Sequence, residues 1–166
     1  MKVNNRKLVL LGLLLGVALI LSFIEFLVPP IVPVPGFKIG LSQTGVLLAF
    51  QLYSIREGAF VALSKTIFVS LLTGTFFTFI FWVGLSGAIL SLPGLYLGKR
   101  LRFSIYSISI LGAIWHNVGQ LLFVGFTVSF SVVLFYLPYI LAASLLAGAL
   151  IGYIAKLLFF FAAKAV

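Results

Sequence analysis

Long apolar stretches, separated by short basic or proline-rich segments, fill nearly the whole sequence. The first covers 8–28, and about 20 apolar residues in a helix are enough to cross the ~30 Å hydrocarbon core of a bilayer. Only 8% of the 166 residues are charged, whereas about 25% are charged in soluble domains. A soluble fold of this size has too little interior to bury so much apolar surface. We therefore expect an all-α, polytopic membrane protein whose apolar side chains are covered largely by lipid.

The apolar pattern predicts six transmembrane helices in one domain that covers 1–166. Their expected bounds are 8–28, 39–53, 58–73, 76–97, 103–126 and 132–154. The proline-rich segment 29–36 cannot continue a helix and is expected to form an external loop. Basic residues ahead of the first stretch resemble a signal peptide, but this stretch is long enough to span and no small-residue cleavage site follows it. We interpret it as a retained first helix.

Basic residues fall mainly on one side of the membrane in this topology. Nine of the eleven Lys and Arg residues lie at ends expected in the cytoplasm: Lys2, Arg6, Lys7, Arg56, Lys99, Arg100, Arg102, Lys156 and Lys164. Because cytoplasmic loops carry an excess of positive charge, both termini are expected in the cytoplasm. The net charge of +9 has the same explanation, since the basic residues are scattered between apolar stretches, and we expect no nucleic acid partner.

The acidic and sulfur-containing residues exclude several kinds of chemistry. The chain has no Cys and no Asp, and its only carboxylate side chains are Glu25 and Glu57. It offers no disulfide or thiolate metal site, and no carboxylate cluster for Mg²⁺, Ca²⁺ or paired-carboxylate hydrolysis. A GxxxxGK[ST] phosphate loop is also missing, so ATP hydrolysis would have to come from a partner. We expect no catalytic residues, no metal and no cofactor, and therefore no self-sufficient enzyme.

Polar side chains within the apolar stretches are candidates for a binding site, because they are costly in a membrane and usually functional. Lys65 lies about seven residues into the third predicted helix. It either snorkels to a headgroup, bonds a carbonyl, or faces an internal cavity that takes an anion. In the fifth helix, His116 and Gln120 share a face at i, i+4, and Asn117 lies three residues from Gln120. A lone buried histidine is commonly structural, but three polar residues together favour a ligand-facing stripe.

A second polar group is expected near the outer membrane boundary. Glu25, Lys38 and Gln43 lie there, and each alone could simply meet interfacial water. Together with the fifth-helix residues they predict an outward-facing polar pocket. The predicted substrate-binding residues are Lys38, Gln43, Lys65, His116, Asn117 and Gln120.

Small residues recur at four-residue spacing, which lets helix backbones approach closely in lipid. The pairs are Gly12–Gly16, Gly84–Ala88, Ala143–Ala147 and Gly148–Gly152. Each pair either packs within the bundle or, for Gly12 and Gly16 in the first helix, forms a docking face for another membrane subunit.

Three segments resemble, in the same order, those of one known family. Residues 35–43, PGFKIGLSQ, resemble the PGxKxGLxN segment of the Gx transporters, also described as heptaprenyl diphosphate synthase component I. Residues 56–75, from REG to SLLTGT, resemble the next block, and HNVGQL at 116–121 resembles the HNxGQ segment. Gln43 replaces an expected Asn, and Lys65 stands where Arg is common; both changes keep the polar character.

This family is similar to the substrate-binding S components of energy-coupling factor (ECF) transporters. The resemblance implies six helices in a prokaryotic cell membrane, a ligand site near the external face, and capture by a membrane scaffold subunit with two cytoplasmic ATPases. It also implies that Gly12 and Gly16 contact the scaffold. The expected function is uptake of a small anionic, vitamin-like or isoprenoid-like compound, with flavin- and quinone-related compounds also open.

Two other functions are consistent with the sequence. The chain could be a non-catalytic accessory of prenyl diphosphate or quinone synthesis, which normally requires Asp-rich motifs that this chain lacks. It could instead hand a flavin or quinone to redox partners. In that case the absent Cys excludes a thiolate-ligated iron–sulfur cluster, and a lone His is a poor haem ligand.

Overall fold

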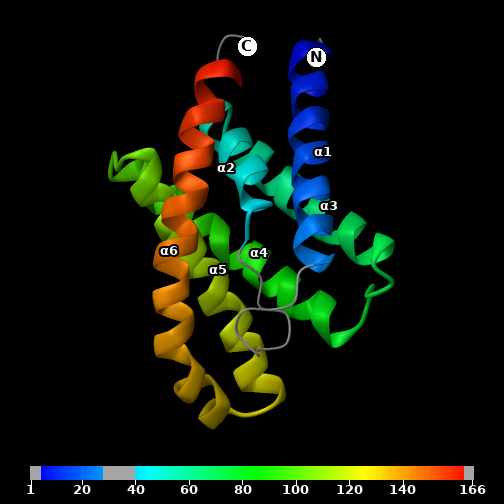
Figure 1. Ribbon diagram of the computed structural model, residues 1–166, viewed down its shortest axis with the longest axis vertical. Helices are drawn as coiled ribbons and strands as arrows, with labels where there is room; N and C mark the ends of the chain where they lie inside the picture. Colours follow the sequence, from blue (N-terminus) through cyan, green and yellow to red (C-terminus); the bar gives the residue numbers. More distant parts are fainter. Residues whose placement is uncertain (1–4, 28–39, 163–166) are drawn as a thin grey trace.

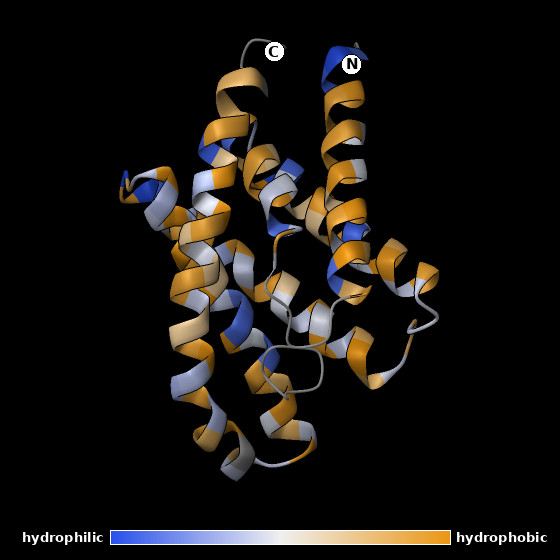
Figure 2. Cartoon of the chain, viewed as in Figure 1, coloured by the Kyte–Doolittle hydropathy of each residue, from blue (hydrophilic) through white to orange (hydrophobic). Residues whose placement is uncertain are grey.

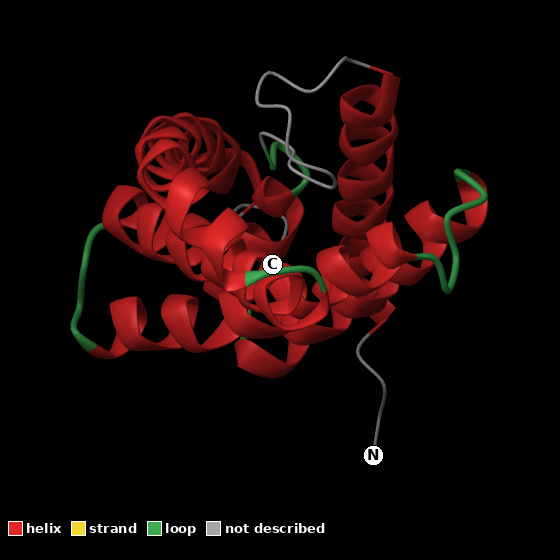
Figure 3. Ribbon diagram, turned by 90° about the horizontal axis from the view of Figure 1, so that it is seen from below, coloured by secondary structure: helices red, strands yellow, loops and turns green. Residues whose placement is uncertain are grey.

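The structure, a computed structural model, describes residues 5–27 and 40–162. Within these ranges the chain folds into helices joined by short loops (Figure 3), as the sequence predicts. The six helices are α1 Asn5–Leu27, α2 Gln43–Leu52, α3 Ile55–Leu72, α4 Phe79–Arg100, α5 Ile105–Thr127 and α6 Phe130–Ala162. The all-α class and the number of helices are therefore confirmed.

Four of these helices have the length and composition of membrane spans. They are α1, α4, α5 and the segment Val133–Phe161 of α6, and they make the chain a multi-pass membrane protein. By contrast, α2 has 10 residues and is about 15 Å long, so it cannot cross a ~30 Å core by itself. That α2 and α3 also lie at membrane depth stays a prediction.

Several helix ends differ from the expected bounds, among them the start of α2 at Gln43 rather than at residue 39, and two of the differences have clear local reasons. Helix α4 begins at Phe79 rather than at residue 76, because Gly74 and Phe77 have positive φ angles of 67° and 59°, which end helical geometry in the α3–α4 loop. Helix α6 continues to Ala162, well beyond the expected end at 154. Residues 157–162 are apolar and contain no helix-breaking Gly or Pro, so the helix has no local reason to stop at residue 154.

The helices pack in two groups, α1 with α2 and α3, and α4 with α5 and α6. Helix α5 packs between α4 and α6, while α1 packs on α2 and α3; contacts between α2 and α6 and between α3 and α4 join the groups. The start of α1 and the end of α6 lie at the same end of the molecule (Figure 1), as an even number of spans requires. Which side of the membrane this end faces stays a prediction.

Helix α2 forms the centre of the bundle. All residues of 44–50 are buried, and the side chains of Val46 to Phe50 are at most 2% exposed. A helix that is apolar on every side is stable only when it is enclosed. Gly45 allows α1 to approach, since a Cβ there would lie 2.6 Å from the Leu14 carbonyl oxygen. At the other end, Lys99 Nζ donates a hydrogen bond of 3.1 Å to the Phe50 carbonyl.

The outer surface is predominantly apolar. Figure 2 shows hydrophobic residues along the outside of the helices, with hydrophilic residues at the start of α1, at the α4–α5 turn and in the interior. Large side chains such as Leu8, Leu72, Phe126 and Leu146 are more than half exposed. This distribution fits a surface that faces lipid.

An ion pair joins α1 to α3 at the end where the two termini lie. Lys7 Nζ lies 2.5 Å from Glu57 Oε1 and 5.2 Å from the centroid of the Tyr53 ring. The Ser54 hydroxyl donates to the other Glu57 oxygen. The hydrogen bond from Lys7, followed by that from Ser54, lowers the pKa of Glu57 from 4.5 to about 2.

This ion pair predicts a pH-dependent contribution to stability. Because the folded pKa of Glu57 is depressed, the contribution is complete above about pH 4.5 and is lost as the pH falls towards 2. Lys7 is 38% exposed, so we expect at most about 1 kcal/mol. The difference in melting temperature between the wild type and Glu57→Gln should therefore shrink over this window and stay constant from pH 6 to 8. A constant difference throughout would show that the pair does not contribute.

Candidate functional site

A histidine–glutamine pair marks the start of the central helix. Gln43, the first residue of α2, lies with its Nε2 atom 2.8 Å from Nδ1 of His116 on α5. The other ring nitrogen, Nε2, lies beside Gly87 of α4, whose backbone is its hydrogen-bond partner. This network assigns the neutral imidazole a proton on Nε2, so that Nδ1 accepts from the Gln43 amide.

Gln120 lies one helical turn beyond His116 and faces the same glycine. A Cβ at Gly87 would lie 2.8 Å from Gln120 Cγ and 2.9 Å from His116 Nε2. The i, i+4 spacing predicted this common face correctly. The role of Gly87 was not predicted. The four-residue spacing from Gly84 selects its neighbour Ala88, and only the packing of α5 against Gly87 shows which small residue faces His116 and Gln120.

Lys65 lies inside the protein. It is 7% exposed, and its Nζ atom donates a hydrogen bond of 3.1 Å to the hydroxyl of Ser42. Ser42 immediately precedes Gln43, so the lysine of α3 and the histidine of α5 reach adjacent residues at the start of α2. A buried ammonium favours an anionic neighbour, since burial of a charge at low dielectric is costly.

Asn117 points to a different neighbour. Its Nδ2 atom donates a hydrogen bond of 2.7 Å to Ser144 of α6, and the Ser144 hydroxyl donates to the Ile140 carbonyl. Both side chains are buried. The structure therefore brings Gln43, His116 and Gln120 together, while Asn117 joins α5 to α6.

The Asn117–Ser144 bond should be measurable as a coupling energy. In a double-mutant cycle of Asn117→Ala and Ser144→Ala, we expect roughly 0.6 kcal/mol and at most about 1.7 kcal/mol of coupling, the range for interhelical hydrogen bonds in membranes. The measurement is the free energy of unfolding in detergent. Additive effects of the two substitutions would contradict the bond.

Glu25 holds the turn that leads into α2. It is 8% exposed, and its Oε1 atom accepts hydrogen bonds of 2.5 Å from Gly40 N–H and 2.6 Å from Leu41 N–H. Gly40 has a φ of +88°, which favours glycine. Glu25 is therefore connected to Gln43 through the backbone of Gly40 and Leu41, and not by a direct side-chain contact that the structure records. The third member of that predicted group, Lys38, lies outside the described residues.

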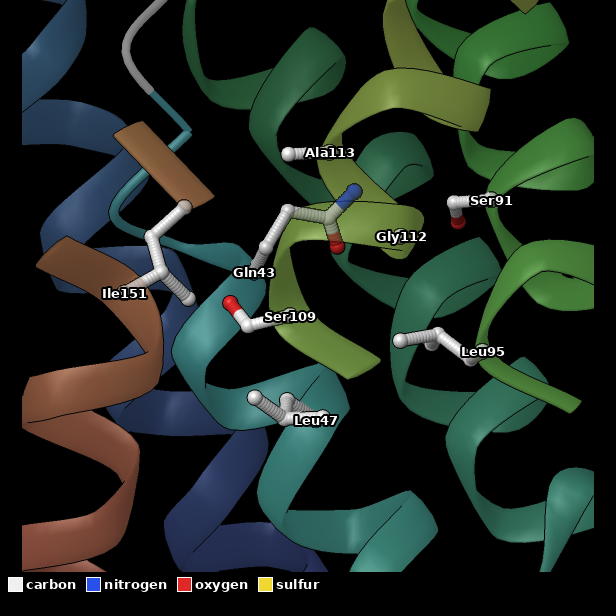
Figure 4. A pocket seen from close by; sticks show the side chains of 8 residues that line it. All are labelled: Gln43, Leu47, Ser91, Leu95, Ser109, Gly112, Ala113 and Ile151. Carbon is white, nitrogen blue, oxygen red and sulfur yellow. The ribbon is translucent and has the colours of Figure 1, made fainter. Parts of the chain in front are cut away.

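A small cavity lies next to Gln43, between α2, α4, α5 and α6. Its volume of ≈ 20 Å³ is about that of one water molecule. Two buried polar atoms next to it have no hydrogen-bond partner among the described residues, namely Gln43 Oε1 and Ser109 Oγ. The residues that line it are Gln43, Leu47, Ser91, Leu95, Ser109, Gly112, Ala113 and Ile151 (Figure 4). Ser91 and Ser109 were not predicted, since a serine in an apolar helix gives no signal of what it faces.

The small-residue pairs divide into packed and open ones. A Cβ at Gly148 would lie 2.6 Å from a backbone atom of α5, and a Cβ at Gly152 would lie 2.9 Å from another, so both glycines pack within the bundle. Around Gly12 and Gly16 no atom of the described residues lies within 4 Å of such a Cβ. The interpretation as internal packing therefore fails for Gly12 and Gly16, whose face of α1 is open.

The described residues contain no group of three or more His, Cys, Asp or Glu side chains that could hold a metal ion. The polar cluster instead consists of one buried ammonium, one imidazole, two amides and a hydroxyl, on Lys65, His116, Gln43, Gln120 and Ser42. Such groups bind by charge and hydrogen bonding.

Comparison with known proteins places the chain in a family. A solved structure of the S component of a bacterial ECF transporter has the same fold, with a TM-score of 0.72 and 20% identity over 98% of each chain. No curated protein sequence matches. The model of the family described as heptaprenyl diphosphate synthase component I matches residues 14–158. The chain therefore belongs to the heptaprenyl diphosphate synthase component I family, as the resemblance of its three segments predicted.

Proposed function

We propose that this protein is the membrane-embedded, substrate-binding subunit of an ECF-type transporter in a prokaryotic cell membrane. The observation that carries the proposal is the polar cluster around the start of α2, where Lys65, Gln43 and His116 converge inside an otherwise apolar bundle. Because polar groups at membrane depth are costly, a binding role explains their presence better than packing does. The S-component fold supports the same function.

The chemistry of the cluster indicates the class of substrate. Lys65 supplies a buried positive charge, and the amides of Gln43 and Gln120 supply directional hydrogen bonds. A small anionic compound with hydrogen-bonding groups, vitamin-like or isoprenoid-like, fits this combination, and Asn117 and Lys38 remain candidate contacts.

The partners follow from the missing energy source. The chain has no phosphate-binding loop, so a scaffold subunit with two ATPases would drive transport. The open face of α1 at Gly12 and Gly16 is the proposed scaffold contact, because close helix approach in lipid needs small residues.

Large side chains on this face should prevent docking. We expect the double variant Gly12→Leu, Gly16→Leu to recover roughly tenfold less scaffold and ATPase on purification, which corresponds to about 1.4 kcal/mol. Its fold and its bound small molecule should be unchanged, since both positions face open space. Undiminished recovery of the partners would place the scaffold elsewhere.

The proposal as a whole is tested by mass spectrometry of the tagged protein, gently extracted from its own host. A scaffold subunit with paired ATPases and a co-purified anion would support it. A soluble prenyl synthase or redox protein, with no ATPase, would contradict it.

The family description motivates a second candidate, a non-catalytic accessory of prenyl diphosphate or quinone synthesis. The chain has no Asp for the magnesium-binding motifs of such enzymes, so the purified chain alone should give no prenyl transfer. Stimulation of a soluble synthase by the added chain would favour this candidate, and an absorption spectrum would reveal a bound flavin.

A further inference from the structure

Of the two serines that line the cavity, Ser109 behaves differently from Ser91 and from other serines of the bundle. Ser70, Ser86 and Ser91 each donate to the carbonyl three residues earlier in their own helix. Ser109 is only 4% exposed, yet its hydroxyl has no partner among the described residues and lies next to the cavity. A buried polar group left unsatisfied costs about 1–3 kcal/mol, so a partner is required.

The side-chain oxygen of Gln43, which also lines the cavity, needs a hydrogen-bond partner as well. The Gln43 amide uses its nitrogen on His116, whereas its oxygen is buried without a partner. Figure 4 shows this oxygen and the Ser109 hydroxyl on the lining of one space. Both atoms can accept a hydrogen bond, and Ser109 can also donate one.

We propose that the cavity holds one water molecule that bridges Gln43 Oε1 and Ser109 Oγ. The volume of ≈ 20 Å³ admits about one water, and the site is polar on two sides, as a buried water needs. The water donates to the amide oxygen and accepts from, or donates to, the hydroxyl. Four of the remaining lining residues are apolar, namely Leu47, Leu95, Ala113 and Ile151.

This water makes Ser109 a positioning residue for His116. With the water donating to Gln43 Oε1, the amide presents its NH₂ group to His116 Nδ1, which leaves the ring proton on Nε2. The reversed amide would place an acceptor against Nδ1 and would force the proton there. Nε2 would then be an acceptor beside the Gly87 backbone, with which it hydrogen-bonds. The water and the Gly87 backbone together favour one tautomer of the imidazole.

The inference rests on the proposed function only in that Gln43 and His116 belong to the proposed substrate site. Water and tautomer are both measurable without any substrate or partner. A failure of the transport proposal, read from co-purification, is therefore distinguishable from a failure here.

The tautomer can be read directly, because His116 is the only histidine of the chain. We would label the full chain with ¹⁵N-histidine, place it in nanodiscs and record its ring nitrogens by NMR. The wild type should show a protonated Nε2 and an unprotonated Nδ1. Ser109→Ala should give a mixture of tautomers or a shifted Nδ1 resonance, whereas Ser91→Ala is the matched control, because its hydroxyl already donates to Ala88.

A crystal structure of the wild-type chain that resolves ordered water provides a second measurement that needs no variant. We expect one water about 2.7–3.1 Å from both Gln43 Oε1 and Ser109 Oγ. An empty cavity, a Ser109 hydroxyl turned to a carbonyl of its own helix, or a wild-type proton on Nδ1 would each overturn the proposal. So would identical histidine spectra for the wild type and Ser109→Ala.

Discussion

Lys65→Met is expected to remove most of the small molecule that co-purifies with the protein. Methionine keeps an unbranched apolar stem but lacks the ammonium, which is buried at the start of α2. Removal of one partner of a buried charged contact costs about 2–5 kcal/mol. At 1.4 kcal/mol per tenfold, affinity should fall roughly 30-fold to more than 1,000-fold. The measurement is the amount of bound anion per protein by mass spectrometry, followed by calorimetry once the compound is known.

Two further lysine variants make this result specific. Lys65→Arg keeps the charge and should retain part of the binding, although its planar group has a different geometry. Lys156→Met is the matched control, because Lys156 is an exposed residue on α6, near Tyr106, and its loss should leave the bound compound unchanged. If Lys65→Met retains the wild-type amount of ligand, the polar cluster at the start of α2 is not the substrate site.

The helices could be predicted because membrane burial leaves a strong signal in the sequence. Stretches of about 20 apolar residues in α1, α4, α5 and α6 have few alternatives to a spanning helix. The same signal could not reveal that α2 lies at the centre of the bundle. Its residues 44–50 are apolar, or small and polar, on every side, and lipid or protein can cover such a surface equally well.

The candidate site was predictable where spacing along one helix decides which residues share a face. His116 and Gln120 are such a case, and both lie against Gly87. Contacts between distant segments leave no comparable pattern. The sequence could not show that Glu25 accepts hydrogen bonds from two backbone N–H groups. It could not show either that the buried Ser109 hydroxyl has no partner among the described residues. Both features depend on how α1, α2 and α5 pack.

Gly45→Ala is expected to destabilise the bundle far more than the same change elsewhere in the first two helices. The added Cβ would lie 2.6 Å from the Leu14 carbonyl oxygen and 2.9 Å from Ala18 Cβ, closer than real Cβ contacts. Because a backbone atom cannot turn aside as a side chain can, α1 must shift away from α2. Overpacking of this kind costs about 1–3 kcal/mol, or roughly 3–10 °C in melting temperature for a chain of this length.

Gly16→Ala is the matched control, since no atom of the described part of the chain lies within 4 Å of its added Cβ. Alanine favours a helix over glycine by about 1 kcal/mol, so this variant should be as stable as the wild type or slightly more stable. Thermal unfolding of both variants in the same detergent decides the matter. Equal melting temperatures would mean that α1 does not pack on α2 through Gly45, and the division of α1 into a face packed against Gly45 and an open face at Gly12 and Gly16 would fail with it. A large loss at Gly45 alone would instead leave the open face of Gly12 and Gly16 available for a partner helix.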